Sequence, residues 1–240
     1  MGEIMGDCQG EKIREGILKE PIEIDGKDKT LFEIKPKMFA EQLFALDLWL
    51  MKKLTIFDFL SKSKEFSVYV KQVSCVEFIT EAAVKYSEKK KKAFEFFMNV
   101  AIESLELGEY NVAFMVYSAV TSQIILFCDD WEDVSKSCSE KYKDLEQIFG
   151  ISNVKEYTKH FEQCKRNKVP IVANIIGIID RCNVEKLSEL KGDDYALAFA
   201  SRTRLPGRVL VPLYNILKNQ PVFTPEPSLQ RFLGLCLNTQ

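Results

Sequence analysis

The sequence predicts an all-α protein built as a single domain. From residue 36 onward, apolar side chains recur at the three- and four-residue spacing of amphipathic helices. No run of alternating apolar and polar residues, the pattern of a half-buried strand, follows residue 35. No stretch rich in proline, glycine and serine separates the helical segments, and we find no internal repeat. We therefore expect a flexible leader at 1–30 and one helical domain at 31–240.

The first segments change from irregular to helical. Residues 1–30 are charged and punctuated by glycines, with one short strand expected at "PIEI", residues 21–24. A helix is expected over 36–54, because Pro36 suits the first helical position, where its missing N–H is not needed. Its apolar face consists of Phe39, Leu43, Leu46 and Leu50. A second short helix is expected at 55–60.

The middle of the chain contains the strongest helical patterns. Residues 91–107 alternate between an apolar and a charged face, and residues 111–127 are apolar nearly all round. The second segment is therefore expected to be the buried centre of the domain. Residues 129–150 carry two capping signals, Asp129 with Glu132 and Ser137 with Glu140, and end at Gly150. A further helix is expected at 154–165, and another begins at Pro170.

The overall charge excludes some classes of partner. Lys and Arg number 33 against 35 for Asp and Glu, so the net charge is −2. This balance supplies no general attraction to nucleic acid or to an anionic membrane. No apolar run reaches the roughly 20 residues of a membrane span. The seven cysteines are widely spaced, with no CxxC pair and no preceding signal peptide, which indicates free thiols and a cytoplasmic location.

Covalent enzyme chemistry is not expected. The chain has a single histidine, His160, which has only Cys164 at helical spacing, so neither a metal site nor a catalytic relay is predicted. No GxSxG, GxGxxG or GxxxxGK[ST] motif is present to hold a nucleophile or cradle a phosphate. We therefore expect no metal and no cofactor.

Several short motifs resemble, in order, those of Ras-type guanine nucleotide exchange domains, the catalytic domain of the Son-of-sevenless class. The similarity covers roughly residues 31–237. It begins with Ala40-Glu41-Gln42-Leu43, Asp47 and Asp58-Phe59-Leu60, and continues through "AFEFFMNVAIESLELGEYN", Trp131 in "FCDDWEDV", Tyr157, Pro170, "LAFASRTR" and "NQPVFTPEPSLQRFL".

The resemblance implies a function that needs no cofactor. Members of this family bind a Ras-superfamily small GTPase and promote release of its GDP. The segment that begins at Pro170 leads, in the family, into a helical hairpin that wedges open the nucleotide site. We therefore expect a helical bundle with a protruding hairpin, acting through binding linkage: the factor must prefer the nucleotide-free GTPase.

The stretch "KVPIVANIIGIIDRCN", residues 168–183, is where this hairpin would start. On a helix, its broad apolar side consists of Ile171, Val172, Ile175, Ile176 and Ile179. Asn174, Gly177 and Arg181 face away, with Ile178 beside them. Most of the apolar side is expected to pack in the core. Val172 is the exception, because the family uses an aromatic or aliphatic residue there to touch the GTPase.

The resemblance supplies two groups of candidate site residues. The GTPase-binding group is Val172, Ile178, Tyr157, Glu109 and Tyr110. The catalytic group holds the acidic residues nearest the expected hairpin, namely Asp180, Glu185 and Asp194.

Some positions depart from the family pattern. Ile178-Ile179 stands where the family has Asp or Asn followed by Leu. The family's Leu-Asn-Asn-Phe is replaced by residues 107–110, which removes two amides expected to hydrogen-bond across the hairpin base. Pro212 falls in a helix that is continuous in the family, where a proline should kink or restart it. Residues 1–30 leave no room for the helical module that commonly precedes the catalytic domain.

Three hypotheses follow from these similarities and departures. The first is an active exchange factor of unusual sequence. The second is a GTPase- or adaptor-binding module that keeps the fold without exchange, a form that would also suit a secreted pathogen effector acting in host cytoplasm. The third is a helical scaffold unrelated to GTPases.

Overall fold

The computed structural model describes residues 15–16, 18–182, 191–219 and 221–237. The described part is helical apart from one small antiparallel hairpin, so the predicted all-α class is confirmed. The elements in chain order are β1 (Ile22–Ile24), β2 (Lys27–Lys29), the 3-10 turn η1 (Leu31–Glu33), α2 (Pro36–Met51), α3 (Ile56–Ser61), α4 (Lys64–Val73), α5 (Cys75–Tyr86), α6 (Lys90–Leu107), α7 (Tyr110–Leu126), α8 (Cys128–Glu132), α9 (Lys136–Phe149), α10 (Val154–Gln163), α11 (Val172–Cys182), α12 (Gly192–Lys218) and α13 (Pro227–Leu237).

Helix α7 is the centre of the bundle, as its all-round apolar sequence predicts. It packs between α5 and α6, and α2 covers the other side of α6. Aromatic rings fill this layer: Phe39 of α2 lies against Phe96 and Phe97 of α6, with ring centroids 5.6 and 6.5 Å apart. The body of the molecule therefore encloses one continuous apolar core.

The N-terminal hairpin belongs to this core. The strand predicted at residues 21–24 is present as β1, whose Ile22 and Ile24 are buried and lie near α13. It pairs with β2 through a turn at Asp25 and Gly26, which both have positive φ as two-residue hairpins require. The polar strand β2 was not expected. This part of the predicted flexible leader is packed rather than loose, and the domain boundary at residue 30 stays a prediction.

Some helix boundaries differ from those predicted. Helix α9 is capped by Ser135, whose hydroxyl accepts from the N–H of Cys138, and not by Ser137. Helix α8 begins at Cys128, so Asp129 lies inside its first turn and is not its cap. The adjacent α4 and α5 were not predicted, although Phe66, Tyr69 and Val73 have helical spacing and are buried.

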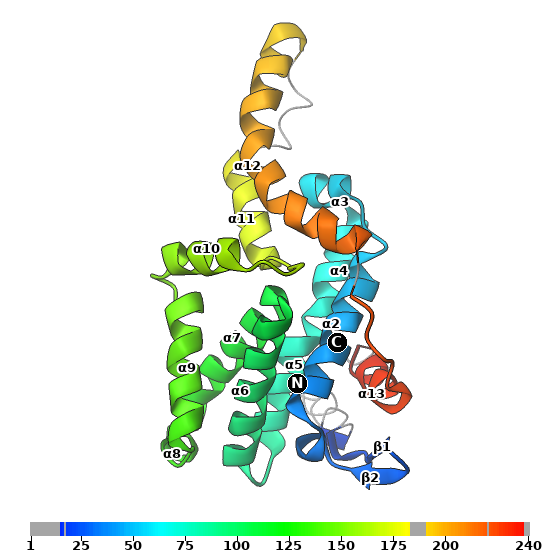
Figure 1. Cartoon of the computed structure of the whole chain (residues 1–240), viewed down its shortest axis with the longest axis vertical. Coiled ribbons are helices and arrows are strands. Elements are labelled where there is room, and N and C mark those ends of the chain that lie inside the picture. The colour runs from blue at the N-terminus through cyan, green and yellow to red at the C-terminus, as the bar shows by residue number, and fades with distance from the viewer. Residues whose placement is uncertain (1–14, 17, 183–190, 220, 238–240) are drawn as a thin grey trace, which may run out of the picture.

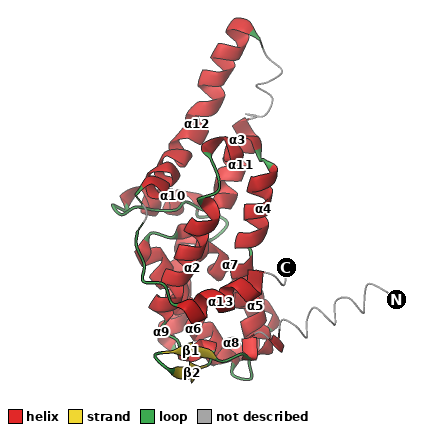
Figure 2. Cartoon of the chain, turned by 90° about the vertical axis from the view of Figure 1, so that its right-hand side faces the viewer, coloured by secondary structure: helices red, strands yellow, loops and turns green. Residues whose placement is uncertain are grey.

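Two helices near the C-terminal end of the chain form a hairpin that rises from the body. Helices α11 and α12 pack against each other as a hairpin, and the upper part of α12 extends beyond the rest of the molecule (Figures 1 and 2). Helix α12 stays helical through Pro206 and Pro212, so of the two outcomes expected at Pro212, a kink or a restart, the restart does not occur. Figure 1 shows that α12 bends along its length, as expected where proline removes helical hydrogen bonds.

The predicted absence of a membrane span was tested on the described helices. None of them is both long and apolar enough to cross a bilayer.

Candidate functional site

The hairpin is attached to the body at the corner between α6 and α7. Gly108 ends α6 with a φ of +88°, a conformation that favours glycine, and a Cβ at this position would lie 2.5 Å from the carbonyl oxygen of Asn167. The N–H of Val169 donates to the Gly108 carbonyl at 2.9 Å, and the N–H of Tyr110 donates to the Val169 carbonyl at 3.1 Å. The segment leading into α11 is therefore paired backbone to backbone with this corner.

A buried polar network continues the attachment into α11. The N–H of Val172 donates to Oδ1 of Asn111 at 3.1 Å, and Asn111 Nδ2 donates to Oδ2 of Asp47 at 3.1 Å. The hydroxyl of Tyr69 donates to the other oxygen of Asp47 at 2.8 Å. The network thus joins α2, α4, α7 and the first turn of α11. Gly108 and Glu109 lack the two family amides, and the side-chain amide of Asn111 bonds across the hairpin base instead.

Glu109 is part of this network and not of the surface. Its Oε1 accepts from the N–H groups of Asn111 at 3.1 Å and Val112 at 3.2 Å, which caps α7. Its Oε2 has no hydrogen-bond partner among the described residues. Burial, with a further contribution from the neighbouring Asp47 charge, raises the pKa of Glu109 well above its ordinary value. Burial also raises the pKa of Asp47 to about 6, against the opposing effect of the hydrogen bonds from Asn111 and Tyr69.

An aromatic cluster supports the same corner from α10. The ring of Tyr110 lies 5.9 Å from that of Tyr157 and 4.9 Å from that of Phe161, both edge-on. The Tyr110 hydroxyl and His160 Nδ1 share a hydrogen bond of 2.8 Å. The hydroxyl of Tyr157 accepts from the N–H of Ile171 at 3.3 Å, and burial raises the pKa of Tyr157 to about 12. His160 is thus a structural residue whose pKa is lowered by burial.

The predicted GTPase-binding residues divide into buried and accessible ones. Glu109 and Tyr110 are fully buried, and Val172 is only 4% exposed. We correct the prediction for these three, because a buried side chain offers no surface to a partner; they hold the hairpin base from below. Tyr157 and Ile178 are half-buried, and a contact role for them stays a prediction.

The predicted catalytic acids are not brought together. Asp180 is exposed near the end of α11, where it forms an ion pair with Lys62. Asp194 is exposed in the first turn of α12. Glu185 lies outside the described residues. The expectation that most aliphatic residues of the stretch 168–183 pack in the core is confirmed, since Ile171, Ile175 and Ile179 are buried.

The projecting part of α12 displays apolar side chains that the sequence analysis did not select. Tyr195, Leu197 and Phe199 are all exposed, and the rings of Tyr195 and Phe199 stack at 5.9 Å. Exposed apolar side chains that are grouped on one part of a helix form a surface suited to a protein partner. The signal was the run "YALAF", which lacks the polar face that a free surface helix normally has.

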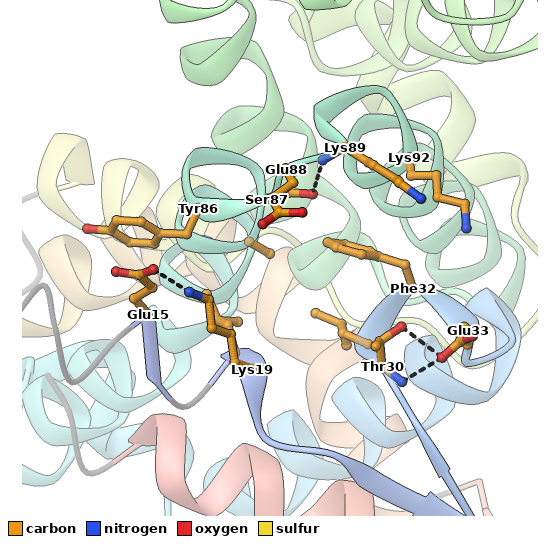
Figure 3. Close-up of a pocket in the computed structure, with 13 residues that line it drawn as sticks. Glu15, Lys19, Thr30, Phe32, Glu33, Tyr86, Ser87, Glu88, Lys89 and Lys92 are labelled. Atoms are coloured by element: carbon orange, nitrogen blue, oxygen red, sulfur yellow. Dashed lines mark hydrogen bonds and ion pairs between the residues drawn. The ribbon is translucent and has the colours of Figure 1, made fainter.

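A pocket of about 460 Å³ lies elsewhere, beside η1 and the turn between α5 and α6 (Figure 3). It is roughly the length of α6, about 27 Å, from Gly108 and the hairpin base. Its rim carries both signs of charge, and Lys19 pairs with Glu15 at 2.5 Å. In the described part of the chain, no group of three or more His, Cys, Asp or Glu side chains could hold a metal.

The fold is a helical bundle with a projecting two-helix hairpin, tied at its base by a buried polar network. A family model described as the RasGEF domain matches residues 38–191, from α2 to the start of α12. The match covers more than half of the chain, and this protein belongs to the RasGEF family. Membership indicates guanine nucleotide exchange on a Ras-family small GTPase. A comparison with curated proteins finds no match.

Proposed function

We propose that this protein promotes GDP release from a Ras-superfamily small GTPase by inserting its α11–α12 hairpin beside the nucleotide site. The observation that carries the proposal is the exposed apolar surface of the projecting end of α12, formed by Tyr195, Leu197 and Phe199. In the free chain, Tyr195 is 42%, Leu197 75% and Phe199 48% exposed. Burying them against a partner is worth about 25 cal/mol per Å² of apolar surface, which favours a complex.

The length of the hairpin suits a wedge. Helix α12 has 27 residues and α11 has 11, which correspond to about 40 and 16 Å. The end of α12 therefore reaches beyond α11, as Figure 1 shows. A small GTPase holds its nucleotide through phosphates and Mg²⁺, and its switch segments are ordered by these contacts. An element of this reach can occupy the space of a displaced switch segment while the body of the factor grips the GTPase beside it.

Negative charge at the outer end of α12 would also favour release of the nucleotide. Asp193 and Asp194 lie in the first turn of α12, at its outer end. A carboxylate placed near the nucleotide site repels the phosphates and competes with them for Mg²⁺ and for a lysine that would otherwise bind phosphate. Tyr157 near the base and Ile178 near the far end of α11 are half-buried and would contribute apolar contact with a switch segment. Glu185 stays a candidate on the family pattern alone.

The energetic requirement is differential binding. To convert a GTPase from 1% to 99% nucleotide-free, the factor must bind the empty form about 10⁴-fold more tightly than the loaded form. No cofactor takes part in this step. Exchange therefore depends on contacts that only the nucleotide-free GTPase can make, and the hairpin is the element placed to make them.

A second candidate is a module that binds a GTPase or an adaptor without exchange, including one delivered by a pathogen into host cytoplasm. The observation that favours it is the pairing of Asp180 with Lys62, which leaves one predicted catalytic acid engaged within the chain. The exposed residues of α12 alone could still support binding.

The experiment is release of fluorescent GDP from a panel of Ras, Rap, Ral, Rho, Rab and Arf GTPases, with and without the protein. Exchange predicts faster release from one branch of the panel. Capture of a GTPase without faster release would replace exchange by the binding module. Neither release nor capture across the panel would contradict both.

A further inference from the structure

The corner between α3 and α4 touches the hairpin at a second place, away from the α6–α7 attachment. Helix α3 contacts both α11 and α12. Directly after α3, Lys62 extends its ammonium group to the carboxylate of Asp180, a residue 118 positions further along the chain. The two side chains are 33% and 47% exposed, so the pair lies at the surface where the hairpin leaves the body.

The backbone around Lys62 is held from both sides. Before it, the Thr55 hydroxyl oxygen caps α3 by accepting from the N–H of Asp58 at 3.4 Å, and the N–H of Thr55 donates back to Oδ2 of Asp58 at 2.7 Å. After it, the Ser63 hydroxyl accepts from the N–H of Phe66 at 3.1 Å and caps α4. Lys62 itself has a φ of +49°, which ends α3 and turns the chain between the two caps.

The corner is also packed into the core. Phe59 of α3 is buried, with its ring 5.0 Å from Phe66 and 6.4 Å from Tyr69. Tyr69 is the residue that donates to Asp47 in the network beneath the hairpin base. The ammonium of Lys62 therefore extends from a support that is continuous with the rest of the body.

A helix that is attached at two separated points has less freedom to change its orientation than a helix attached at one. The first attachment of α11 is at Val172, where its N–H meets Asn111. Asp180 lies eight residues further on, about 12 Å along the helix axis. Buried Ile175 and Ile179 also pack α11 against the body, so the motion left to it is a small pivot about its N-terminal turn. The ion pair at the far end opposes this pivot and sets the direction in which α12 projects.

We propose that Lys62 is a positioning residue, which sets the orientation of the α11–α12 hairpin through its ion pair with Asp180. Asp180 then acts through the direction of the hairpin and not on the nucleotide. The consequence for activity rests on the proposed exchange function, whereas the orientation itself does not. Orientation matters for exchange because a wedge misplaced by about 1 Å can lose a large factor in rate.

The orientation is measured first, without any GTPase. Spin labels are introduced as non-natural amino acids at Ile125 of α7 and Ala200 of α12, both exposed, because the natural cysteines would also react with thiol labels. Pulsed electron resonance then gives the distribution of distances between body and hairpin. Lys62→Ala and Asp180→Asn are expected to broaden it. The reversed pair, Lys62→Asp with Asp180→Lys, is expected to restore it.

The matched control is Lys136→Ala, which removes an exposed ion pair with Glu140 on α9 and should leave the distribution unchanged. An unchanged distribution in Lys62→Ala, or a reversed pair that fails to restore it, would overturn the inference.

Exchange on the responding GTPase is the second readout. A surface pair of this kind shifts a population by up to about fivefold, so Lys62→Ala should lower the saturating release rate by up to that factor. The concentration for half-maximal release should stay unchanged, and the reversed pair should restore the rate. Suppose that the single variants broaden the distance distribution and the reversed pair restores it, while even the unaltered protein releases no nucleotide. In that case the inference stands and the proposed exchange function fails.

Discussion

The side-chain oxygen of Asn111 accepts a hydrogen bond of 3.1 Å from the N–H of Val172, which ties the central helix α7 to the first turn of α11. The first N–H groups of a helix have no partner within the helix, so a buried helix start needs such an acceptor. The same side chain donates to Asp47, so one residue connects the hairpin to the core. Asn111 is therefore the main attachment point of the hairpin.

Replacing Asn111 by alanine should destabilise the fold. The change leaves the N–H of Val172 and Oδ2 of Asp47 without this buried partner, which costs about 1–3 kcal/mol per group left unsatisfied. The free energy of unfolding, measured with urea, should fall by at least about 2 kcal/mol. Asn215→Ala, at an exposed position of α12, should change it by less than about 0.5 kcal/mol. Equal effects of the two variants would remove Asn111 from this role.

Stability should depend on pH through Glu109 and Asp47. A carboxyl group whose pKa is higher in the folded than in the unfolded state contributes its full stabilisation at pH values below the unfolded-state pKa. This contribution is lost as the pH rises toward the folded-state pKa. For Asp47, this stabilisation is lost between pH 3.8 and about pH 6. For Glu109, the loss begins at about pH 4.5 and continues at higher pH. The free energy of unfolding should therefore decrease from pH 4 to pH 7.

Glu109→Gln tests the origin of this dependence. Glutamine keeps an oxygen to accept from the N–H groups of Asn111 and Val112, but it does not titrate and gives Asp47 a neutral neighbour. The loss of stability between pH 4 and pH 7 should become smaller than in the unaltered protein. Glu106→Gln, an exposed change in the last turn of α6, should leave the pH profile unchanged. A Glu109→Gln profile parallel to the original would contradict the assignment.

Gly108→Ala should loosen the hairpin base. The new methyl group meets the carbonyl oxygen of Asn167 at 2.5 Å, and the φ of +88° is unfavourable for alanine. We expect a loss of at least about 1–3 kcal/mol, seen as a lower Tm. Gly234→Ala, within α13 and with no atom near the added methyl group, should instead raise stability by about 0.5–1 kcal/mol. A Gly108→Ala variant as stable as Gly234→Ala would exclude the close packing described.

The sequence predicted the fold class and the buried centre because both depend on local periodicity. The pattern of α7 identifies it without knowledge of its neighbours, and Pro36 marks the start of α2 as expected. The strand β2 could not be found in this way, because "KDK" has no alternation and becomes a strand only by pairing with β1.

The site was harder to predict because burial depends on distant segments. Glu109 is charged in sequence and Val172 matches a family contact position, yet both are covered by helices far away in the chain. Asn111 was detectable as a polar residue beginning an apolar helix, but its partner Val172 lies 61 residues away. The pairing of Lys62 with Asp180 has no local signal at all.

The most direct measurement is the saturating rate of GDP release from the responding GTPase, with Leu197→Asp compared with Ile125→Asp. Leu197 is 75% exposed and Ile125 is 77% exposed. Leu197 lies on the projecting end of α12, whereas Ile125 lies near the C-terminal end of α7, away from the hairpin base. The account predicts a rate about 10- to 100-fold lower for Leu197→Asp, the loss of 1–3 kcal/mol typical of a buried contact, and an unchanged rate for Ile125→Asp. Equal rates for Leu197→Asp and the unaltered protein would contradict a hairpin that acts as the wedge.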